Sequence, residues 1–260
     1  MKKRAREVRK KIIEMAAGTG AYHLGSSLSC VDLLVFLTSK KNLDPGDAFR
    51  DRLILSKGHA ASALYAAFCK SNLCLEEDLK EFYCNGGRLA GHPTYGSLKA
   101  VEATTGSLGH GLPIGVGMAL AGKGKFSVFV LMSDGECNEG SVWEAALFAS
   151  RHKLDNLVGV IDCNNLQAFG TTEEVLGLEP LKDKWKSFGW EVLTIDGHDF
   201  EQISRAFSKT PFKKGRPSMI IAKTVKGKGV LFMENKLEWH YNLLDEKLKK
   251  KALEQLEKEK

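Results

Sequence analysis

The chain has 260 residues, of which 43% are hydrophobic and 27% are charged, and its formal net charge is +6 at pH 7. This length suits one large domain with a complete core, and the composition is that of an ordinary soluble globular protein. No apolar stretch approaches a transmembrane span, and the short apolar segment after the basic start contains Glu14, which argues against a signal peptide. We therefore expect a cytoplasmic protein that does not bind a membrane.

Helical periodicity and short apolar runs alternate along the chain. Apolar spacing, with Gly and Pro as boundaries, predicts helices at about 3–17, 30–39, 59–70, 110–121, 141–152 and 200–208. Short apolar runs predict strands at 52–56, 126–132, 157–162, 191–195 and 218–223. Because these runs are almost continuously apolar, they favour a mostly parallel sheet covered on both faces, as in an α/β fold.

The excess of positive charge lies mainly near the ends, in MKKRAREVRKK and in the mixed-charge tail LLDEKLKKKALEQLEKEK. Both segments show helical spacing of apolar residues, which favours solvated amphipathic helices over a nucleic-acid surface. No DNA- or RNA-binding motif supports the alternative, so we expect no nucleic-acid partner. The expected organisation is one domain over residues 1–240 and a charged helical tail over 241–260.

The cysteines are scattered, and none forms a CxxC pair. They are Cys30, Cys69, Cys74, Cys84, Cys137 and Cys163. This spacing argues against a zinc knuckle and against a redox dithiol, and in a reducing compartment we expect free thiols.

Polar residues follow each of the five predicted strands. In chain order these segments are SKGH, SDGE, DCNN, DGHD and KTVKGKG. Ligands of parallel α/β sheets gather at the C-terminal ends of the strands, so the segments predict a binding site at that edge.

Asp134 and Asn164 end two neighbouring predicted strands, about one βαβ unit apart. A hard cation such as Mg²⁺ takes one or two protein oxygens together with phosphate oxygens, and this pair would provide two. Either residue alone is more simply explained as a helix cap or a turn residue. The pair at this spacing favours a metal and phosphate site.

Glycine is frequent in ATTGSLGHGLPIGVGMALAG, residues 103–122. A glycine-rich loop that leads into a helix lets backbone amides approach a ligand closely. The spacing is not that of a dinucleotide-binding fingerprint, and VKGKGV lacks the spacing and the Ser or Thr of a Walker A loop.

Four of the seven histidines lie in loops or at the starts of elements, beside Gly or aromatic residues: His23, His59, His92 and His240. This placement suits an exposed site, although each histidine alone is more often structural. Glu139 and Glu144 follow Asp134 and are either acids favoured by a helix dipole or buried acids with shifted pKa values.

These segments together resemble the thiamine-diphosphate enzymes, and specifically the N-terminal, diphosphate-binding half of transketolase. The family's GDG motif and a later Asn-containing segment appear here as SDGECNEG and IDCNN. Five further segments occur in the family's order: GSSLSCVDLL, LILSKGHAASALYA, GHPTYG, EATTGSLGHGLPIGVGMA and KTVKGKGVLFMENKLEWH. The resemblance covers about residues 8–242 and implies a three-layer α/β/α thiamine-diphosphate-binding fold.

The resemblance assigns ligand roles to particular residues. Mg²⁺, with Ca²⁺ or Mn²⁺ as substitutes, would be bound by Asp134, Asn164 and the backbone carbonyl of Leu166. Thiamine diphosphate would be contacted by His59, Gly106, Ser107, Leu108, Gly135, Glu136, Asn164 and His240.

The resemblance also implies the reaction, which is transfer of a two-carbon ketol unit from a ketose or ketose phosphate to an aldose or aldose phosphate. The cofactor supplies the nucleophilic carbon and the electron sink, while the protein orients the sugar and moves protons. The residues implied are His59 and His240 near the diphosphate and reacting centre, His23 and His92 at the donor sugar's hydroxyls, and Glu139 and Glu144 between paired active sites.

Three positions depart from the family pattern. HLGSS stands where HPG is typical, Ser133 replaces the first Gly of GDG, and Ser107 replaces the Pro of TGPLG. A complete transketolase continues into pyrimidine-binding and C-terminal domains, and this sequence stops before them. The resemblance therefore implies a split enzyme, in which a second chain supplies those domains and two copies of each chain assemble.

Two other functions remain open. One is a subunit of another thiamine-diphosphate enzyme, similar to deoxyxylulose-phosphate synthase or a 2-oxo-acid dehydrogenase, but His92 in GHP and the pair Trp239 and His240 favour transketolase. The other is a non-catalytic scaffold protein, against which the intact Asp134, Asn164 and four histidines argue. The sugars used are not predicted, because anion recognition would lie largely on the second chain.

Overall fold

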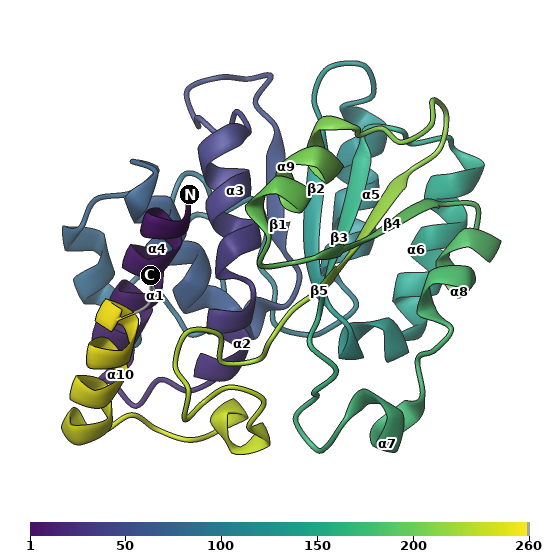
Figure 1. Cartoon of the computed structure of the whole chain (residues 1–260). Helices are drawn as coiled ribbons and strands as arrows, with labels where there is room; N and C mark the ends of the chain where they lie inside the picture. The colour runs from purple at the N-terminus through teal and green to yellow at the C-terminus, as the bar shows by residue number, and fades with distance from the viewer. Residues whose placement is uncertain (259–260) are drawn as a thin grey trace.

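The computed structural model describes residues 1–258. Five parallel strands form one sheet in the order β1-β2-β3-β5-β4 (Figure 1). Their bounds are Arg52–Leu55 (β1), Val128–Ser133 (β2), Leu157–Cys163 (β3), Glu191–Asp196 (β4) and Ser218–Lys223 (β5). The predicted α/β fold with a mostly parallel sheet is confirmed, and the sheet is parallel throughout the described strands.

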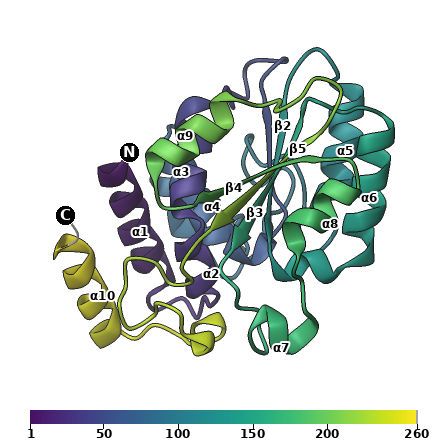
Figure 2. The same cartoon turned by 45° about the vertical axis from the view of Figure 1, so that its right-hand side comes forward.

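Helices cover both faces of the sheet and give three layers (Figures 1 and 2). One face carries α1 (Lys2–Ala16), α3 (Val31–Lys40), α4 (Ala61–Lys70) and α9 (Phe200–Ser208). The other carries α5 (Gly111–Ala121), α6 (Gly140–Arg151) and α8 (Leu181–Ser187). Shorter or peripheral helices are α2 (Leu24–Ser29), α7 (Thr172–Leu176), α10 (Glu246–Lys258), and the 3-10 turns η1 (Gly58–Ala60), η2 (Glu77–Glu81), η3 (Gly135–Asn138) and η4 (Leu237–His240).

Strand β2 explains why the apolar runs are continuous. Phe129 and Leu131 pack in the core under α1, α3, α4 and α9, whereas Val128 and Val130 pack in the core under α5, α6 and α8. Successive side chains of a strand point to opposite faces, so a sheet covered on both sides needs apolar residues at every position.

The predicted elements match the structure closely, with boundary differences of one or two residues. The predicted strand at 126–132 begins two residues later, at Val128, and the predicted helix at 59–70 begins as the 3-10 turn η1 before α4. The short helices α2, α7 and α8 were not predicted. All six residues of α2 are buried, so it has no exposed face and no amphipathic pattern.

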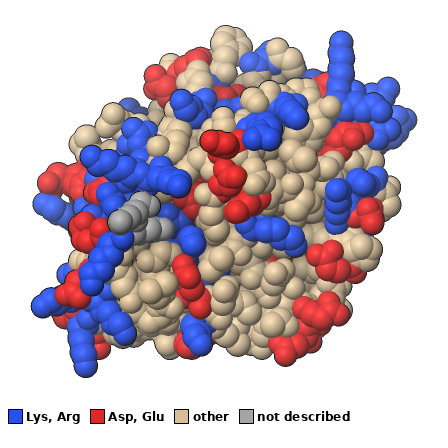
Figure 3. Space-filling model, in the orientation of Figure 1, with Lys and Arg blue, Asp and Glu red and all other residues tan. Residues whose placement is uncertain are grey.

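The C-terminal helix α10 packs against α1. Ala252 and Leu256 are buried in the core, and Lys10 of α1 forms an ion pair with Glu257 of α10. Figure 3 shows Lys and Arg side chains gathered over the side of the molecule where these two helices lie.

All six cysteines are free thiols, as predicted. Four of them are buried, and Cys69 lies in α4, Cys137 in η3 and Cys163 in β3. Within residues 1–258, no helix is long and apolar enough to cross a membrane.

Candidate functional site

A cavity of about 530 Å³ opens at the C-terminal edge of the sheet. Its walls come from segments that are distant in the sequence. These are Asp134 after β2, the segments that follow β1 and β3, and the glycine-rich loop. Its lining includes His23, His59, His92, Gly106, Leu108, Asp134, Gly135, Glu139, Asn164, Leu166 and His240. Most of the residues predicted to bind the cofactor, the metal or the substrate therefore lie around one cavity.

Asp134 lies beside the segment that follows β3, because the strand register aligns Ser133 with Asp162. Its carboxylate accepts hydrogen bonds from the backbone N–H groups of Gly135 (2.8 Å) and Asn165 (2.6 Å). Burial, together with the charge of Asp162, raises the pKa of Asp134 to about 6. A cation bound here would favour the ionised carboxylate, which retains lone pairs for ligation.

Asn164 and Leu166 lie on the same wall as Asp134. The Asn164 side-chain oxygen accepts a hydrogen bond from the Leu166 backbone N–H at 3.2 Å, which fixes the amide. Within residues 1–258, no three His, Cys, Asp or Glu side chains are grouped to hold a metal. A cation in this cavity would therefore need amide, carbonyl and ligand oxygens in addition to the carboxylate of Asp134.

Two glycines are required by close approach of neighbouring loops. A Cβ atom at Gly135 would lie 2.8 Å from Cγ and Cδ of Gln167, and one at Gly58 would lie 2.8 Å from the backbone nitrogen of Gly106. Any other residue at Gly58 would push the two loops apart, whereas at Gly135 the side chain of Gln167 would have to move. The glycine-rich loop thus packs directly on the segment after β1.

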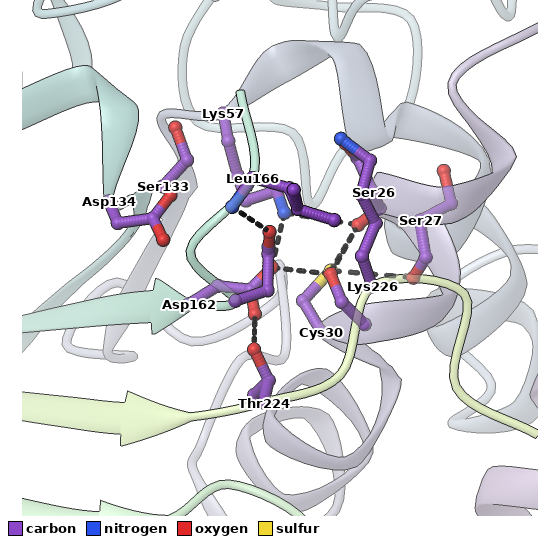
Figure 4. Close-up of polar contacts among 12 residues, drawn as sticks. Ser26, Ser27, Cys30, Lys57, Ser133, Asp134, Asp162, Leu166, Thr224 and Lys226 are labelled. Carbon is purple, nitrogen blue, oxygen red and sulfur yellow. Dashed lines mark hydrogen bonds and ion pairs between the residues drawn. The ribbon is translucent and has the colours of Figure 1, made fainter. Parts of the chain in front are cut away.

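A buried polar network lies beneath the cavity (Figure 4). Lys57 forms an ion pair with Asp162, and both side chains are fully buried. Asp162 also accepts hydrogen bonds from Ser29 Oγ (2.6 Å) and from Thr224 Oγ1, and Lys57 Nζ donates to the Ser26 carbonyl (3.0 Å). This network joins α2 to the ends of β1, β3 and β5.

The pKa values of the pair follow from this geometry. Burial alone would lower the pKa of Lys57 and raise that of Asp162. Their mutual attraction outweighs burial, so the pKa of Lys57 is raised and that of Asp162 is lowered. Both groups are therefore charged at neutral pH.

Lys226 is the second fully buried lysine of this region. Its Nζ donates a hydrogen bond to His240 Nδ1 (3.2 Å) and is 3.5 Å from the Gln167 carbonyl oxygen, and no carboxylate among residues 1–258 forms an ion pair with it. Burial, and then the charge of Lys57, lowers the pKa of Lys226 to about 8. The region beneath the cavity therefore carries an unneutralised positive charge that suits an anionic ligand.

The four predicted histidines form one cluster. The centroid of the His23 ring lies 4.7 Å from that of His240, 5.2 Å from that of His59 and 6.1 Å from that of His92. His23 has a left-handed backbone (φ 66°) at the start of α2, and its backbone N–H donates to the His240 carbonyl at 3.1 Å. The strained conformation of a non-glycine residue at this position is held by the surrounding structure.

Burial keeps these histidines neutral at neutral pH. It lowers the pKa of His23 to about 4 and that of His240 to about 3, with further lowering by neighbouring charges, and it lowers the pKa values of His59 and His92. Because His240 Nδ1 accepts from Lys226, its Nε2 carries the proton. A neutral imidazole can donate one hydrogen bond and accept another.

Three predicted site residues do not line the cavity. Ser107 and Glu144 are exposed, and Glu136 is fully buried. Glu136 accepts hydrogen bonds from Ser56 Oγ and from the Gly109 backbone N–H (2.8 Å), so it joins the end of β1 to the glycine-rich loop. Ser26 and Lys57 of the lining and the buried Lys226 were not predicted individually, although they lie in segments that the sequence marks. Further lining residues that were not predicted are Ser133, Asn138, Gln167, Ala168, Phe169, Val175 and Leu176.

The family of this chain follows from comparison with known proteins. Residues 2–258 match the family described as "Transketolase, thiamine diphosphate binding domain". The chain belongs to the transketolase family. The match confirms the predicted family and the predicted cofactor, thiamine diphosphate.

Relatives of similar length are named as transketolase subunits. The chain is 42% identical to one subunit of the apulose-4-phosphate transketolase of Phocaeicola vulgatus, over 90% of this chain and 86% of the relative. It is 41% identical to a 6-deoxy-6-sulfo-D-fructose transketolase subunit of a Clostridium species, over 98% and 95%. These matches confirm that the chain is one subunit of a transketolase, and they favour this function over the other thiamine-diphosphate enzymes.

Solved transketolase structures share the fold but extend well beyond it. The transketolase of Campylobacter jejuni superposes with a TM-score of 0.85 at 32% identity, over 98% of this chain and 42% of that chain. The chain thus spans less than half the length of this transketolase.

Proposed function

We propose that this chain is the diphosphate- and Mg²⁺-binding subunit of a two-subunit transketolase that transfers a two-carbon ketol unit from a ketose to an aldose. One observation carries the proposal: the carboxylate of Asp134 and four clustered neutral histidines line a single cavity, and one of these histidines, His240, is contacted by the buried Lys226, which has no ion pair among residues 1–258. A carboxylate ligand with a buried cation nearby suits a metal diphosphate, and the histidines suit hydrogen bonding and proton transfer on a polar substrate.

The donor set fits a metal diphosphate. Asp134, the amide oxygen of Asn164 and the carbonyl of Leu166 would hold the cation, and diphosphate oxygens would complete its coordination. Lys226, His59 and His240 would hold the diphosphate itself. The raised pKa of Asp134 and the lowered pKa of Lys226 support this fit, because a bound cation and a bound anion would each stabilise the charged form of the group beside it.

Bound thiamine diphosphate supplies the nucleophilic carbon and the electron sink for cleavage of the ketose. The chain's own contribution is positioning and proton transfer. His23 and His92 would hydrogen-bond the donor sugar's hydroxyls, and the Nε2–H of His240 would donate a hydrogen bond toward the reacting centre. Glu139 and Glu144 are exposed, which suits the proposed place between paired active sites.

The proposal includes a partner chain that carries the pyrimidine-binding and C-terminal domains, with two copies of each chain in the assembly. Phe169 and Leu176 support it, since both line the cavity yet are 84% and 60% exposed. Large apolar side chains at a cavity mouth are typical of a surface that a partner covers. Six free thiols suit the cytoplasm.

The substrates in this proposal are sugars that carry a phosphate or another anionic group. The named relatives act on apulose 4-phosphate and on 6-deoxy-6-sulfofructose, which both carry an anion. We expect the anion to be recognised mainly by the partner chain.

Reconstitution tests this proposal. Ketol transfer is measured with this chain alone, with the partner chain alone and with the mixture, each with Mg²⁺ and thiamine diphosphate. We expect activity only in the mixture, and substantial activity of this chain alone would contradict the split arrangement.

A second measurement tests the metal assignment. Asp134→Ala should weaken calorimetric binding of thiamine diphosphate to the assembled enzyme by about tenfold or more, since a charged ligand contact is lost. Asp183→Ala, at a side chain that is 71% exposed, is the matched control and should bind normally. Equal binding by the two variants would show that Asp134 does not hold the metal.

A further inference from the structure

A second cavity, of about 360 Å³, lies among α1, α3, the start of α9 and the segment after β5. Five cations line it together with one carboxylate: Lys2, Lys3, Arg6, Arg9, Lys228 and Asp32. It shares no lining residue with the cofactor cavity, and the proposed reaction uses none of these groups.

The one carboxylate on this wall is already neutralised. Asp32 lies 2.6 Å from Nη2 of Arg9 and 2.7 Å from Nδ1 of His198. Burial alone would raise the pKa of Asp32, but Arg9 and His198 hold it below its usual range, so Asp32 stays ionised and paired. Asp32 therefore has little charge left to offset the remaining cations.

Arg9 has a donor without a protein partner. The residue is only 3% exposed, and its Nε atom is buried without a hydrogen-bond partner in the described part of the chain. Buried donors are nearly always satisfied, by protein, by water or by a ligand. Since Arg9 lines the cavity, this wall carries more hydrogen-bond donors than the described residues satisfy.

The start of α1 makes the cavity more positive. The first turn contains Lys2 and Lys3 and no acidic residue. The N-terminal end of a helix already carries partial positive charge, so two lysines there are unfavourable unless an anion is nearby. Lys228 is only weakly offset, with its Nζ 3.7 Å from a carboxylate oxygen of Glu234.

We propose that this cavity binds a small anion built on two linked or neighbouring phosphate groups, either inorganic pyrophosphate or the diphosphate of an organic metabolite. The volume exceeds the need of a single phosphate, and the ring of Phe200 on the wall provides an apolar contact for an organic group. A cavity of this volume suits a small molecule better than the extended backbone of a nucleic acid. Lys228 of this cavity stands two residues after Lys226, whose Nζ contacts His240 of the cofactor cavity.

Calorimetric titration of the full chain with inorganic pyrophosphate, in the absence of Mg²⁺, tests the site. The cofactor cavity also accepts diphosphate in the function proposed above, so two variants separate the sites. Lys3→Gln/Lys228→Gln should weaken one binding event by about tenfold or more, because two charge-assisted contacts are removed. Lys226→Gln should leave that event unchanged, and Lys182→Gln/Lys213→Gln, at exposed lysines elsewhere, is the charge-matched control.

The outcomes are distinct. Weaker pyrophosphate binding in the Lys3→Gln/Lys228→Gln variant alone supports the site, and this result does not depend on binding at the cofactor cavity. Binding in that variant within twofold of the wild type, or complete loss in Lys226→Gln, overturns it. A parallel titration with adenosine 5′-diphosphate distinguishes the sources: tighter binding than pyrophosphate identifies an organic diphosphate, and equal or weaker binding identifies the inorganic ion.

Discussion

The segments after β1 and β5 each bury one lysine beneath the cofactor cavity, and the two lysines differ in what neutralises them. Lys57 and Lys226 are both 0% exposed. Lys57 has a carboxylate partner in Asp162, and its pKa is raised. Lys226 has only His240 and a carbonyl oxygen, and its pKa falls to about 8.

This difference separates a structural charge from a binding charge. Removing an ion from water costs several kcal/mol, and a buried partner recovers that cost only when the geometry is good. Lys57 and Asp162 recover it within the chain, with Ser29 and Thr224 satisfying the remaining acceptor positions. The free-energy cost of burying Lys226 is not offset by a carboxylate partner within the described residues. A bound anion would offset it.

The largest effect is expected from Lys57→Met. The substitution leaves the Asp162 carboxylate buried without its cation, so we expect the free energy of unfolding to fall by about 3–5 kcal/mol. Urea denaturation of the chain measures the loss. Lys57→Met/Asp162→Asn is the control and should recover part of the stability, because no buried charge remains. A loss below about 1 kcal/mol in the single variant would mean that the pair is not structural.

Lys226→Gln should weaken cofactor binding without destabilising the chain, in contrast to Lys57→Met. We expect the affinity of the assembled enzyme for thiamine diphosphate to fall by about tenfold to a hundredfold, and the free energy of unfolding to stay equal or rise. Calorimetry measures the first and urea denaturation the second. Lys182→Gln, at an exposed lysine that lines neither cavity, is the matched control. If Lys226→Gln destabilises the chain as much as Lys57→Met, the distinction between the two lysines fails.

Much of this site could be predicted from the sequence, because strand ends and glycines have local signals. Asp134 and Asn164 each follow a continuous apolar run, and parallel strands bring such ends to one edge. The histidines His23, His59, His92 and His240 were found because glycines and family motifs surround them. Their neutral state could not be predicted, since it depends on burial by segments distant in the sequence.

The buried lysines had no local signal. Lysine is almost never fully buried unless it is paired, and the partner of Lys57 lies 105 residues away. Glu136 and Glu139 stand three residues apart in SDGECNEG, and the sequence did not indicate that Glu136 would be buried and Glu139 exposed. The short turn η3 directs Glu136 inward and leaves Glu139 exposed after it, and such turns leave little pattern in the sequence.

Thr224→Val tests how much the network around Asp162 adds to the ion pair. The substitution keeps the shape but removes one hydroxyl donor to a buried carboxylate, so we expect a loss of about 1.5–3 kcal/mol in the free energy of unfolding. Thr224→Ser keeps the hydroxyl and should lose less. If Thr224→Ser loses more than Thr224→Val, packing of the methyl group and not the hydrogen bond is the larger contribution.

The smallest effect is a pH dependence that belongs to Lys226 alone. Its pKa is about 8 in the folded chain and 10.5 in the ordinary side chain, so below pH 8 both the folded and the unfolded chain hold the proton. Between these values only the unfolded chain holds it, and the free energy of unfolding should therefore rise with pH, by at most about 1.4 kcal/mol per pH unit. The other lysines and the tyrosines also titrate in this range. The contribution of Lys226 is therefore measured as the difference in free energy of unfolding between the wild type and Lys226→Met, by urea denaturation from about pH 7.5 to 9.5. We expect the difference in stability to shrink as the pH rises, because the wild type loses its buried charge. A constant difference would mean that Lys226 keeps its proton and is neutralised within the chain, as Lys57 is.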